Sequence, residues 1–424
     1  MRVRHASDGI RNRAEIVVTR CQHLANFSED LASTRRTFLS PPMRDCHREI
    51  AGWLEPLGVE VSVDAAGNLR GVYPAVESNA PKLLIGSHLD TVPNAGAYDG
   101  ILGVVLAVAL LDALDQRRFP FAIEVVGFSE EEGVRFGAPF IGSRALIGRL
   151  DEELLSRCDA QGISVRKAIE NFGLNPGEIS QAVLRADTLA YVEFHIEQGP
   201  VLEKLGRPLG VVDTINGQSR LEFTFVGRAS HAGTTPMDVR YDAIAAAAEW
   251  ITAVERLARD TSGLVATVGR INAKPGATNV IAGEARLTLD VRHSSDEDRI
   301  GAVENCIRLA EQISRRRGLS VSHNTQLNQQ AVPMDPILMN EIEEAIRKTG
   351  CKLHRMVSGA GHDAMIMAEK VPAGIIFLRT PGGISHDPAE SVEVEDVAKA
   401  IECGLHLLDQ IESSKAFQKR KCRA

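Results

Sequence analysis

The sequence predicts an α/β fold whose chain is interrupted by a smaller α+β domain. The first observation is that short apolar segments such as Lys82–Ile85 and Phe121–Phe128 alternate with helical patterns and lead into polar residues. This rhythm is typical of βα units with a site at the carboxyl edge of a sheet. The second observation is that the rhythm changes near residue 213 and resumes after about residue 333. The chain of 424 residues is long enough for two domains.

The predicted catalytic domain comprises residues 1–213 and 334–424. Its first element is a helical region over residues 31–58 that ends near Gly58, and a strand over 59–63 and a turn over 66–68 follow. Further strands are expected at 82–85, 121–128 and 190–194. The apolar segment from Gly100 to Leu114 is expected to form a helix between the first two of these strands.

The predicted inserted domain comprises residues 214–333. Apolar and polar residues alternate with a period of two in the segments 221–226, 264–268 and 285–291, which predicts strands with one solvated face. Long helical patterns over 241–258 and 296–317 separate these segments. The order β-α-β-β-α-β predicts a ferredoxin-like insert.

The composition excludes several classes of protein. A formal net charge of -8 argues against nucleic-acid binding, which requires a basic face. The longest apolar run, residues 101–111, is about half the length that a bilayer span needs, so no membrane partner is expected. The first residues lack the apolar core of a secretory signal, and the cytoplasm is the expected location.

Five segments hold residue types that bind metal ions. They are Gly86–Asp90, Tyr98–Gly100, Glu130–Gly133, Glu193–Gly199 and Gly383–Asp387. Each of the five is weak evidence alone, but together they indicate a dinuclear hydrolase site. A water held between two divalent cations is a nucleophile at neutral pH. Histidine and carboxylate ligands suit zinc, manganese or cobalt alike.

The first two segments also have plain structural interpretations. His88 and Asp90 follow a predicted strand and are either a polar turn or a metal ligand with its partner. In the second case the Asp90 carboxylate is expected to accept from the other imidazole nitrogen and to fix the tautomer. Asp99 precedes a predicted helix, so it is either the N-cap of that helix or a carboxylate that bridges two cations.

The other segments have alternatives as well. Glu130, Glu131 and Glu132 form a solvated acidic loop or a metal site, because adjacent carboxylates repel each other unless cations lie nearby. Adjacent side chains point apart, so one can bind metal while its neighbour acts on water. His195 and His386 taken singly are more often satisfied core histidines than ligands.

Read together, the segments resemble the M20 family of metallo-aminohydrolases, and within it the hydantoinase/carbamoylase branch. That branch includes N-carbamoyl-L-amino acid hydrolases, β-ureidopropionase-like enzymes and allantoate amidohydrolases. The resemblance extends from about residue 30 to residue 410. It is carried by long motifs, namely Gly86-Ser-His-Leu-Asp-Thr91, Glu131-Glu-Gly-Val-Arg-Phe136, His195-Ile-Glu-Gln-Gly199, Ser230-His-Ala-Gly-Thr-Thr-Pro-Met237 and Gly383-Ile-Ser-His386.

The resemblance implies a dinuclear-metal, aminopeptidase-like catalytic domain with an inserted lid and dimerisation domain. It implies two divalent ions per subunit, zinc or manganese, with cobalt or nickel as further candidates. Asp99 would bridge the ions, and His88 and His386 would each hold one. Glu132 and His195 would complete the two sets. Glu131 would be the general base that takes a proton from the bridging water.

The resemblance also implies residues that contact the substrate. His231 would reach the site of the neighbouring subunit in a homodimer and stabilise the developing oxyanion. Arg292 would bind the substrate carboxylate with support from Asn279. Gln198 and His362, the latter in a segment that includes Gly361, would contact the ureido end. Alternatively, His231 is a surface residue and His362 belongs to a structural turn.

The expected reaction is hydrolysis of a linear ureido group on a small carboxylate substrate, with release of ammonia. An N-acyl-amino acid hydrolase or dipeptidase of the same family is the first alternative. His195 argues against it, because those relatives usually carry a carboxylate at that position. A non-catalytic binding protein that retains the fold is the remote alternative. The sequence does not separate allantoate, N-carbamoyl α-amino acids and β-ureido acids.

Overall fold

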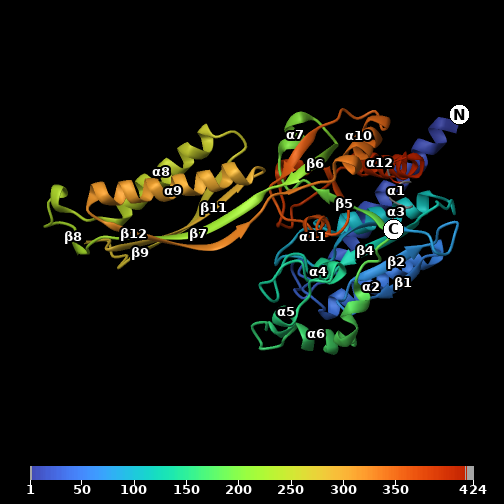
Figure 1. Ribbon diagram of the computed structural model, residues 1–424, viewed down its shortest axis with the longest axis horizontal. Helices are drawn as coiled ribbons and strands as arrows, with labels where there is room; N and C mark the ends of the chain where they lie inside the picture. The colour runs from blue at the N-terminus through green and yellow to red at the C-terminus, as the bar shows by residue number, and fades with distance from the viewer. Residues whose placement is uncertain (1, 416, 418–424) are drawn as a thin grey trace. The chain divides into compact units, whose positions relative to one another are not determined.

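The computed structural model describes residues 2–415 and 417 of the chain, which divide into two compact units (Figure 1). The first unit lies within Met1–Asp213, Met334–Met356 and His362–Ala424. The second unit comprises Thr214–Pro333 and the short segment Val357–Gly361. The α/β class and the separate antiparallel domain predicted from the sequence are confirmed.

A mixed sheet forms the centre of the first unit, with the order β1-β2-β4-β3-β5-β15-β6-β13 and with β14 beside β6. Its four central strands β4, β3, β5 and β15 are parallel, and β1, β2 and β6 pair antiparallel. The strands are β1 (Glu60–Val63), β2 (Leu69–Tyr73), β3 (Lys82–His88), β4 (Ala122–Phe128), β5 (Thr188–Ile196), β6 (Leu209–Ile215), β13 (Val332–Pro333), β14 (Arg355–Ser358) and β15 (Ala373–Leu378).

Helices cover the central strands, which are buried along almost their whole length. These helices are α1 (Arg2–Ala25), α2 (Pro41–Leu54), α3 (Ile101–Ala113), α4 (Ile141–Ile147), α5 (Glu152–Ser156), α6 (Val165–Asn171), α7 (Val201–Leu205), α10 (Pro336–Lys348), α11 (Asp363–Met367) and α12 (Val394–Ser413). Short 3₁₀ turns are η1 (Glu55–Leu57), η2 (Pro176–Ala182) and η4 (Pro381–Gly383).

Helix α3 is the innermost helix of the first unit. It is apolar on every side, as expected for a helix that is covered all round. It packs on β3, β4 and β5, while α1, α2 and α12 pack against it as well. A Cβ atom at Gly103 would lie 2.1 Å from the carbonyl oxygen of Phe194, so the helix touches the strand backbone directly. This contact fixes the start of α3 beside the end of β5.

The N-terminal region differs from the helices predicted over residues 31–58. Residues 31–40 are irregular, and α2 begins only at Pro41, because the residue before a proline disfavours the helical conformation. The irregular segment is held to the loop after β3 instead. Arg36, which is fully buried, donates from its backbone amide to Thr91 Oγ1 and from Nε to the carbonyl of Leu89.

Helix α1 was not predicted, although its sequence carries a signal. Ala14, Val17, Cys21 and Leu24 are all fully buried, at the three- and four-residue spacing of one helix face. The surrounding charged residues hide this pattern when the sequence is read alone.

The second unit is a four-stranded antiparallel sheet in the order β12-β7-β11-β9, with the expected β-α-β-β-α-β sequence of elements. Helices α8 and α9 lie side by side along the sheet and close its apolar core around Trp250 and Phe223 (Figure 1). The elements are β7 (Gly217–Val226), β8 (Ser230–His231), η3 (Met237–Val239), α8 (Ala243–Asp260), β9 (Val265–Lys274), β10 (Val280–Ile281), β11 (Glu284–His293), α9 (Asp296–Arg317) and β12 (Ser320–Gln329).

None of the helices within the described residues combines the length and the apolar character that a membrane span requires.

Candidate metal centre

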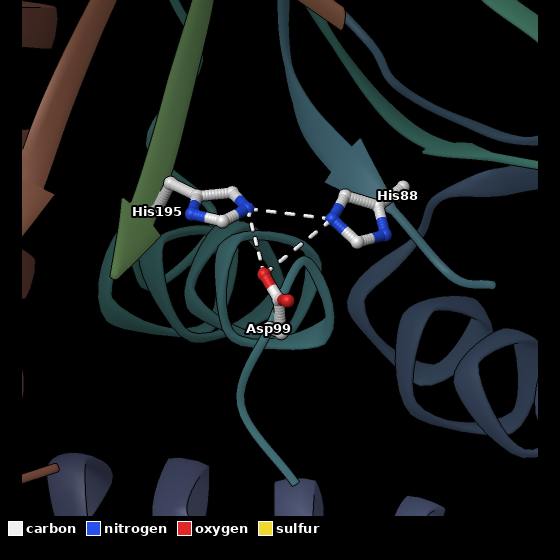
Figure 2. A group of neighbouring side chains, drawn as sticks. All are labelled: His88, Asp99 and His195. Atoms are coloured by element: carbon white, nitrogen blue, oxygen red, sulfur yellow. Dashed lines mark hydrogen bonds and ion pairs between the residues drawn. The ribbon is translucent and has the colours of Figure 1, made fainter. Parts of the chain in front are cut away.

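The five metal-binding segments of the sequence follow the carboxyl ends of the four parallel strands. The segments around His88 and Asp99 follow β3, the glutamates follow β4, His195 ends β5, and His386 lies in the loop after β15. The carboxyl ends of parallel strands meet at one edge of a sheet. Figure 2 shows the result for His88, Asp99 and His195, which point toward one another from β3, β5 and the segment before α3.

Asp99 is the central carboxylate of the site. Its Oδ1 lies 3.2 Å from His195 Nε2 and 3.8 Å from His88 Nε2 (Figure 2). Its Oδ2 lies 3.1 Å from His386 Nε2, which in turn lies 3.5 Å from Glu132 Oε1. Among the described residues, four groups of ligand atoms lie within 4.8 Å of one another, and two of them contain Asp99: one of His88, Asp99 and His195, and one of Asp99, Glu132 and His386. One carboxylate is shared by both groups, as a bridging ligand must be.

The tautomers of the buried histidines favour a cation between them. His88 Nδ1 lies 2.9 Å from the carbonyl oxygen of Asp90, and His195 Nδ1 lies 2.9 Å from that of Ile196. In each neutral ring Nδ1 carries the proton, because a carbonyl only accepts, and Nε2 keeps its lone pair. The two Nε2 atoms face each other at 3.3 Å. A positive charge is needed between two lone pairs at this distance, either a bound cation or, in the metal-free protein, a proton on His88, whose pKa is raised to about 9.

Asp99 is not the N-cap of α3, which was the alternative interpretation of its position. The cap residue of α3 is Gly100, with φ of 71°, and no side chain caps the helix. A Cβ atom at Gly100 would lie 2.5 Å from the ring of His88, so only glycine leaves room for that ring. The Asp99 carboxylate is thereby left to face the histidines.

The loop that carries His386 also depends on glycine. His386 has φ of 57°, and Gly382 and Gly383 before it are likewise in the left-handed region. A Cβ atom at Gly383 would lie 2.9 Å from the backbone nitrogen of Pro200, so the loop packs closely on the segment after β5. The exposed Asp387 accepts from the amide of Ala389 and stabilises the turn that follows.

The three adjacent glutamates have separate surroundings. Glu130 accepts from the amides of Phe38 and Arg135 and holds the loop. Glu131 forms a ligand-type group with His88 and Glu132, and Glu132 reaches His386. They are not a solvated acidic loop, because Glu130 and Glu131 are buried.

Asp90 supports this loop in a way that differs from the prediction. Its carboxylate was expected to pair with His88, but Oδ1 lies 3.7 Å from Nδ1, and the Asp90 carbonyl is the hydrogen-bond partner of that nitrogen. The carboxylate instead accepts from the amides of Glu131 and Glu132, at 2.9 and 3.0 Å. Asp90 therefore fixes His88 through its backbone and the glutamates through its side chain.

The electrostatics of the site also fit divalent cations. Burial and the neighbouring Glu132 carboxylate raise the pKa of Glu131 well above its usual value. Burial and Asp99 raise the pKa of Glu132 to about 7. Burial opposes protonation of His88, but Asp90 and Asp99 raise its pKa to about 9. Such crowding of buried carboxylates is stabilised by bound cations, which favour the charged form of each group.

Two further predicted residues of the first unit lie at this centre. Gln198 Nε2 lies 3.1 Å from each Asp99 oxygen and 3.2 Å from Ser385 Oγ, so in this structure its amide contacts the metal-ligand groups. His362 is buried, and its ring centroid lies 4.4 Å from that of His195 in an edge-to-face arrangement. Burial and the neighbouring His195 lower the pKa of His362 well below its usual value, which keeps the ring neutral.

The remaining predicted residues belong to the second unit. His231 and Asn279 lie side by side, because β8 pairs with β10 and the Asn279 carbonyl accepts from the amide of Ala232. His231 is exposed, and its Nδ1 accepts from the amide of Gly233. The neutral ring therefore carries its proton on Nε2, where it can donate. Gly361, the last residue of this unit, is exposed.

Arg292 is held on β11 of the same unit. Its Nε and Nη2 donate to the two carboxylate oxygens of Asp290, at 2.8 and 3.1 Å, and its Nη1 donates to the carbonyl of Gly359. The planar guanidinium is thus fixed in orientation before any ligand binds.

Sequence reasoning missed one supporting carboxylate. Glu390 is buried, its Oε1 accepts from the amides of Tyr98 and Asp99, and its Oε2 accepts from Ser385 Oγ. It therefore links the Asp99 segment to the His386 loop. Its only sequence signal is its place four residues after His386, among acidic residues that are exposed.

Comparison with known proteins agrees with this geometry. The chain matches Peptidase family M20/M25/M40 over residues 84–410. It is 38% identical to an allantoate deiminase from Arabidopsis thaliana, over 93% of this chain and 81% of that protein. It is 39% identical to an N-carbamoyl-L-amino acid amidohydrolase from Geobacillus stearothermophilus, over 85% of this chain and 89% of that protein. The chain belongs to the M20 family.

A solved structure indicates the branch of the M20 family to which the chain is similar. An amidase of the hydantoinase/carbamoylase family from Burkholderia multivorans superimposes with a TM-score of 0.88 at 29% identity, covering 93% of this chain and 97% of that one. The resemblance to the hydantoinase/carbamoylase branch that the motifs indicated is confirmed. Within this family the chain is an amidohydrolase that acts on a C–N bond other than a peptide bond.

Replacing Glu132 by Gln is expected to stabilise the metal-free protein at pH 8 relative to the wild type, with little difference at pH 5. The pKa of Glu132 is about 7 in the folded protein, against 4.5 normally. The folded state therefore binds this proton more tightly than the unfolded state, and the stability that the proton provides is lost as the pH rises between these values. The glutamine side chain does not ionise, so the variant does not lose stability in this way as the pH rises.

Thermal unfolding in the presence of a chelator, at both pH values, measures this difference. Added Mn²⁺ is expected to reverse the order, because the carboxamide is a poorer ligand than the carboxylate. A difference between the two proteins that is the same at pH 5 and pH 8 in chelator would contradict the electrostatic account.

Proposed function

We propose that this amidohydrolase hydrolyses the ureido C–N bond of a small N-carbamoyl substrate that carries a carboxylate, with release of ammonia. The observation that carries the proposal is the division of the two Asp99 oxygens between two ligand groups. This arrangement, in a chain of the hydantoinase/carbamoylase branch, suits hydrolysis of an unactivated amide-type bond.

The ligand set fits two divalent ions, for which we propose zinc or manganese, with cobalt or nickel as substitutes. His88, His195 and Asp99 would hold one ion, and Asp99, Glu132 and His386 the other. When bound, such ions lower the pKa of a coordinated water and polarise a carbonyl oxygen. The carboxylate and imidazole donors do not distinguish among these metals.

Glu131 is the proposed general base. Its carboxylate lies close to ligand atoms of His88 and Glu132, but it belongs to neither of the two ligand groups that share Asp99. Its carboxylate would accept a proton from the attacking water as the oxygen bonds to the ureido carbon. The same proton would then pass to the terminal nitrogen as the C–N bond breaks, so that ammonia leaves. The carbamate that remains would decompose to carbon dioxide and the free amine.

The other residues of the prediction have roles that suit their geometry. Arg292, oriented by Asp290, would bind the substrate carboxylate with support from Asn279. His231 would donate from Nε2 to the developing oxyanion. Gln198 and His362, with the adjacent Gly361, would contact the ureido end and keep the ligand groups in place.

Two substrate classes are favoured. The relatives include allantoate deiminases from plants and bacterial N-carbamoyl-L-amino acid amidohydrolases, at similar identities. Both classes present a carboxylate and a ureido group, so the chemistry proposed above applies to either. An N-acyl-amino acid hydrolase or dipeptidase is the second candidate function, and the histidine at position 195 argues against it. A non-catalytic protein would not need Glu131 buried beside a full set of ligands.

Assays of ammonia release test the substrate class. The protein, loaded with Mn²⁺, Zn²⁺ or Co²⁺, is expected to release ammonia from allantoate or from an N-carbamoyl-L-amino acid. It is expected to leave an N-acetyl amino acid and a dipeptide intact, since neither carries a ureido group. Cleavage of the N-acetyl compound at a comparable rate would favour the second candidate function instead.

Replacing Glu131 by Gln is expected to lower kcat by roughly 10²–10⁴-fold, the usual contribution of a general base. The metal content should remain that of the wild type, because Glu131 is outside the two proposed ligand sets. Metal analysis and steady-state kinetics on the same sample measure both quantities. The matched variant Glu132→Gln should lose metal as well as activity. Normal turnover by the Glu131→Gln protein would exclude the proposed role.

We further propose that the protein is a homodimer through the inserted domain, with His231 acting in the site of the neighbouring subunit. A mixture of Glu131→Gln and His231→Ala proteins tests this arrangement. Each variant alone is expected to be nearly inactive. Equal mixing with subunit exchange forms dimers of which half are hybrids with one complete site, so about a quarter of wild-type activity should return. No recovery in a mixture that has exchanged subunits would contradict the role of His231 across the dimer.

A further inference from the structure

Glu193 is a buried carboxylate that lies two residues before His195 on β5. Its side chain is inaccessible to solvent. Its Oε1 accepts a hydrogen bond of 3.0 Å from Ser87 Oγ, and its Oε2 accepts one of 2.9 Å from the amide of Ala364. A buried carboxylate is costly unless it is hydrogen-bonded, so both contacts matter to the folded state.

Ser87 and Ala364 each lie close in sequence to a histidine of the site, whereas a third partner, the Tyr191 side chain, lies on β5 itself. Ser87 directly precedes His88 at the end of β3. Ala364 lies in the first turn of α11, two residues after His362. Because Glu193 itself is on β5 with His195, one carboxylate joins the three chain segments that carry His88, His195 and His362. These segments are far apart in the sequence, since Ser87 and Ala364 are 106 and 171 positions from Glu193.

The hydrogen bond between Glu193 and Ser87 connects β5 to β3 at the point where their backbone pairing stops. Backbone pairing between β3 and β5 ends at Gly86 and Glu193. The approach of His88 Nε2 to His195 Nε2, at 3.3 Å, therefore lies beyond the last paired residues of these strands. The Tyr191 hydroxyl donates to the carbonyl of Gly86 just before this point, and the Glu193–Ser87 hydrogen bond continues the connection past it. Side chains thus replace the backbone ladder between β3 and β5 at this point, while His88 and His195 remain paired with β4 and β15 on their other sides.

The contact with α11 acts on the other side of His195. The ring of His362 packs edge-to-face on that of His195, and both rings also lie near Phe377. Holding the amide of Ala364 fixes the first turn of α11, which begins immediately after His362. The position of His362 relative to His195 is therefore coupled to the same carboxylate.

We propose that Glu193 is a positioning residue of the metal centre. It fixes the separation and orientation of His88 and His195, and the packing of His362 against His195, through its hydrogen bonds to Ser87 and Ala364. It does not touch the substrate or the reacting water. The effect on turnover rests on the proposed hydrolytic function, whereas the effect on metal binding does not.

The side chain at position 193 must accept a hydrogen bond from the amide of Ala364, and it must either donate a hydrogen bond to Ser87 Oγ or accept one from it. The amide of Ala364 can only donate, but the hydroxyl of Ser87 can donate or accept. Glutamine can therefore replace Glu193, with its oxygen toward Ala364 and its amide nitrogen toward Ser87. Alanine can form neither bond. The Glu193→Gln variant removes the charge alone, Glu193→Ala removes hydrogen bonding and packing as well, and Ser87→Ala removes a single hydrogen bond.

Titration of the metal-free protein with Co²⁺ provides a test that needs no substrate. The Glu193→Ala protein is expected to bind Co²⁺ about 10–100-fold more weakly than the wild type, the usual cost of losing a residue that orients metal ligands. The visible absorption spectrum of the bound Co²⁺ should change, because it reports the geometry of the histidine ligands. The Glu193→Gln protein should keep the wild-type spectrum and affinity, and Ser87→Ala should lie between the two.

Glu124 offers a matched control on β4, which is separated from β5 by β3 in the sheet. It is also buried, but it pairs with Arg70 on β2 and with Lys82, which lies at the opposite end of β3 from His88. The Glu124→Ala protein should lose thermal stability as Glu193→Ala does, yet keep the Co²⁺ affinity and spectrum of the wild type. In assays with an N-carbamoyl substrate and saturating metal, Glu193→Ala should reduce kcat with little change in KM.

Wild-type Co²⁺ affinity and spectrum in Glu193→Ala would overturn the proposal, as would a Glu193→Gln protein as impaired as Glu193→Ala. Failure of the wild-type protein to hydrolyse any ureido substrate would count against the proposed function alone, because the Co²⁺ measurements stand without it.

Discussion

The Asp99 carboxylate is the contact on which the rest of the metal centre depends. One of its oxygens faces His88 and His195, and the other faces His386. The side chain is free to do so because Gly100 begins α3 in its place, and because Glu390 holds the amides of Tyr98 and Asp99 from behind. Helix α3 is buried on all sides and anchors this segment against the end of β5. The packing of the apolar core around α3 therefore also fixes the position of the polar site.

The second constraint is the concentration of negative charge at the carboxyl edge of the parallel strands. Asp90, Asp99, Glu131 and Glu132 are buried or half-buried together, and burial raises the pKa of both glutamates. Backbone amides relieve part of this repulsion, since Asp90 accepts from the amides of Glu131 and Glu132. The facing Nε2 atoms of His88 and His195 need a proton or a cation between them as well. The same crowding of carboxylates is what suits the site to divalent cations.

The two units carry side chains of different electrostatic character. The first unit concentrates carboxylates and neutral imidazoles, which suit cations but not an anionic substrate. The second unit supplies groups of the opposite kind, an arginine oriented by Asp290 and a histidine whose tautomer places a proton on Nε2. In the proposed reaction, Arg292 would bind the substrate carboxylate and His231 would stabilise the developing oxyanion.

The sequence by itself determined the fold class, the family and the set of candidate ligands. His88, Glu132 and His195 each follow a predicted strand within a long motif, whereas His386 lies in a further motif and Asp99 precedes a predicted helix. The sequence did not determine how those residues are held. The helix predicted across residues 31–40 is an irregular segment tied to the loop after β3, and α1 was not predicted at all. The Asp90 carboxylate accepts from the glutamate amides, while the Asp90 carbonyl is the hydrogen-bond partner of His88, and Glu193 and Glu390 act through hydrogen bonds to distant segments. These contacts join residues more than 40 positions apart, and local patterns carry no information about such pairs. Only the tertiary structure, which brings the strand ends to one edge, decided them.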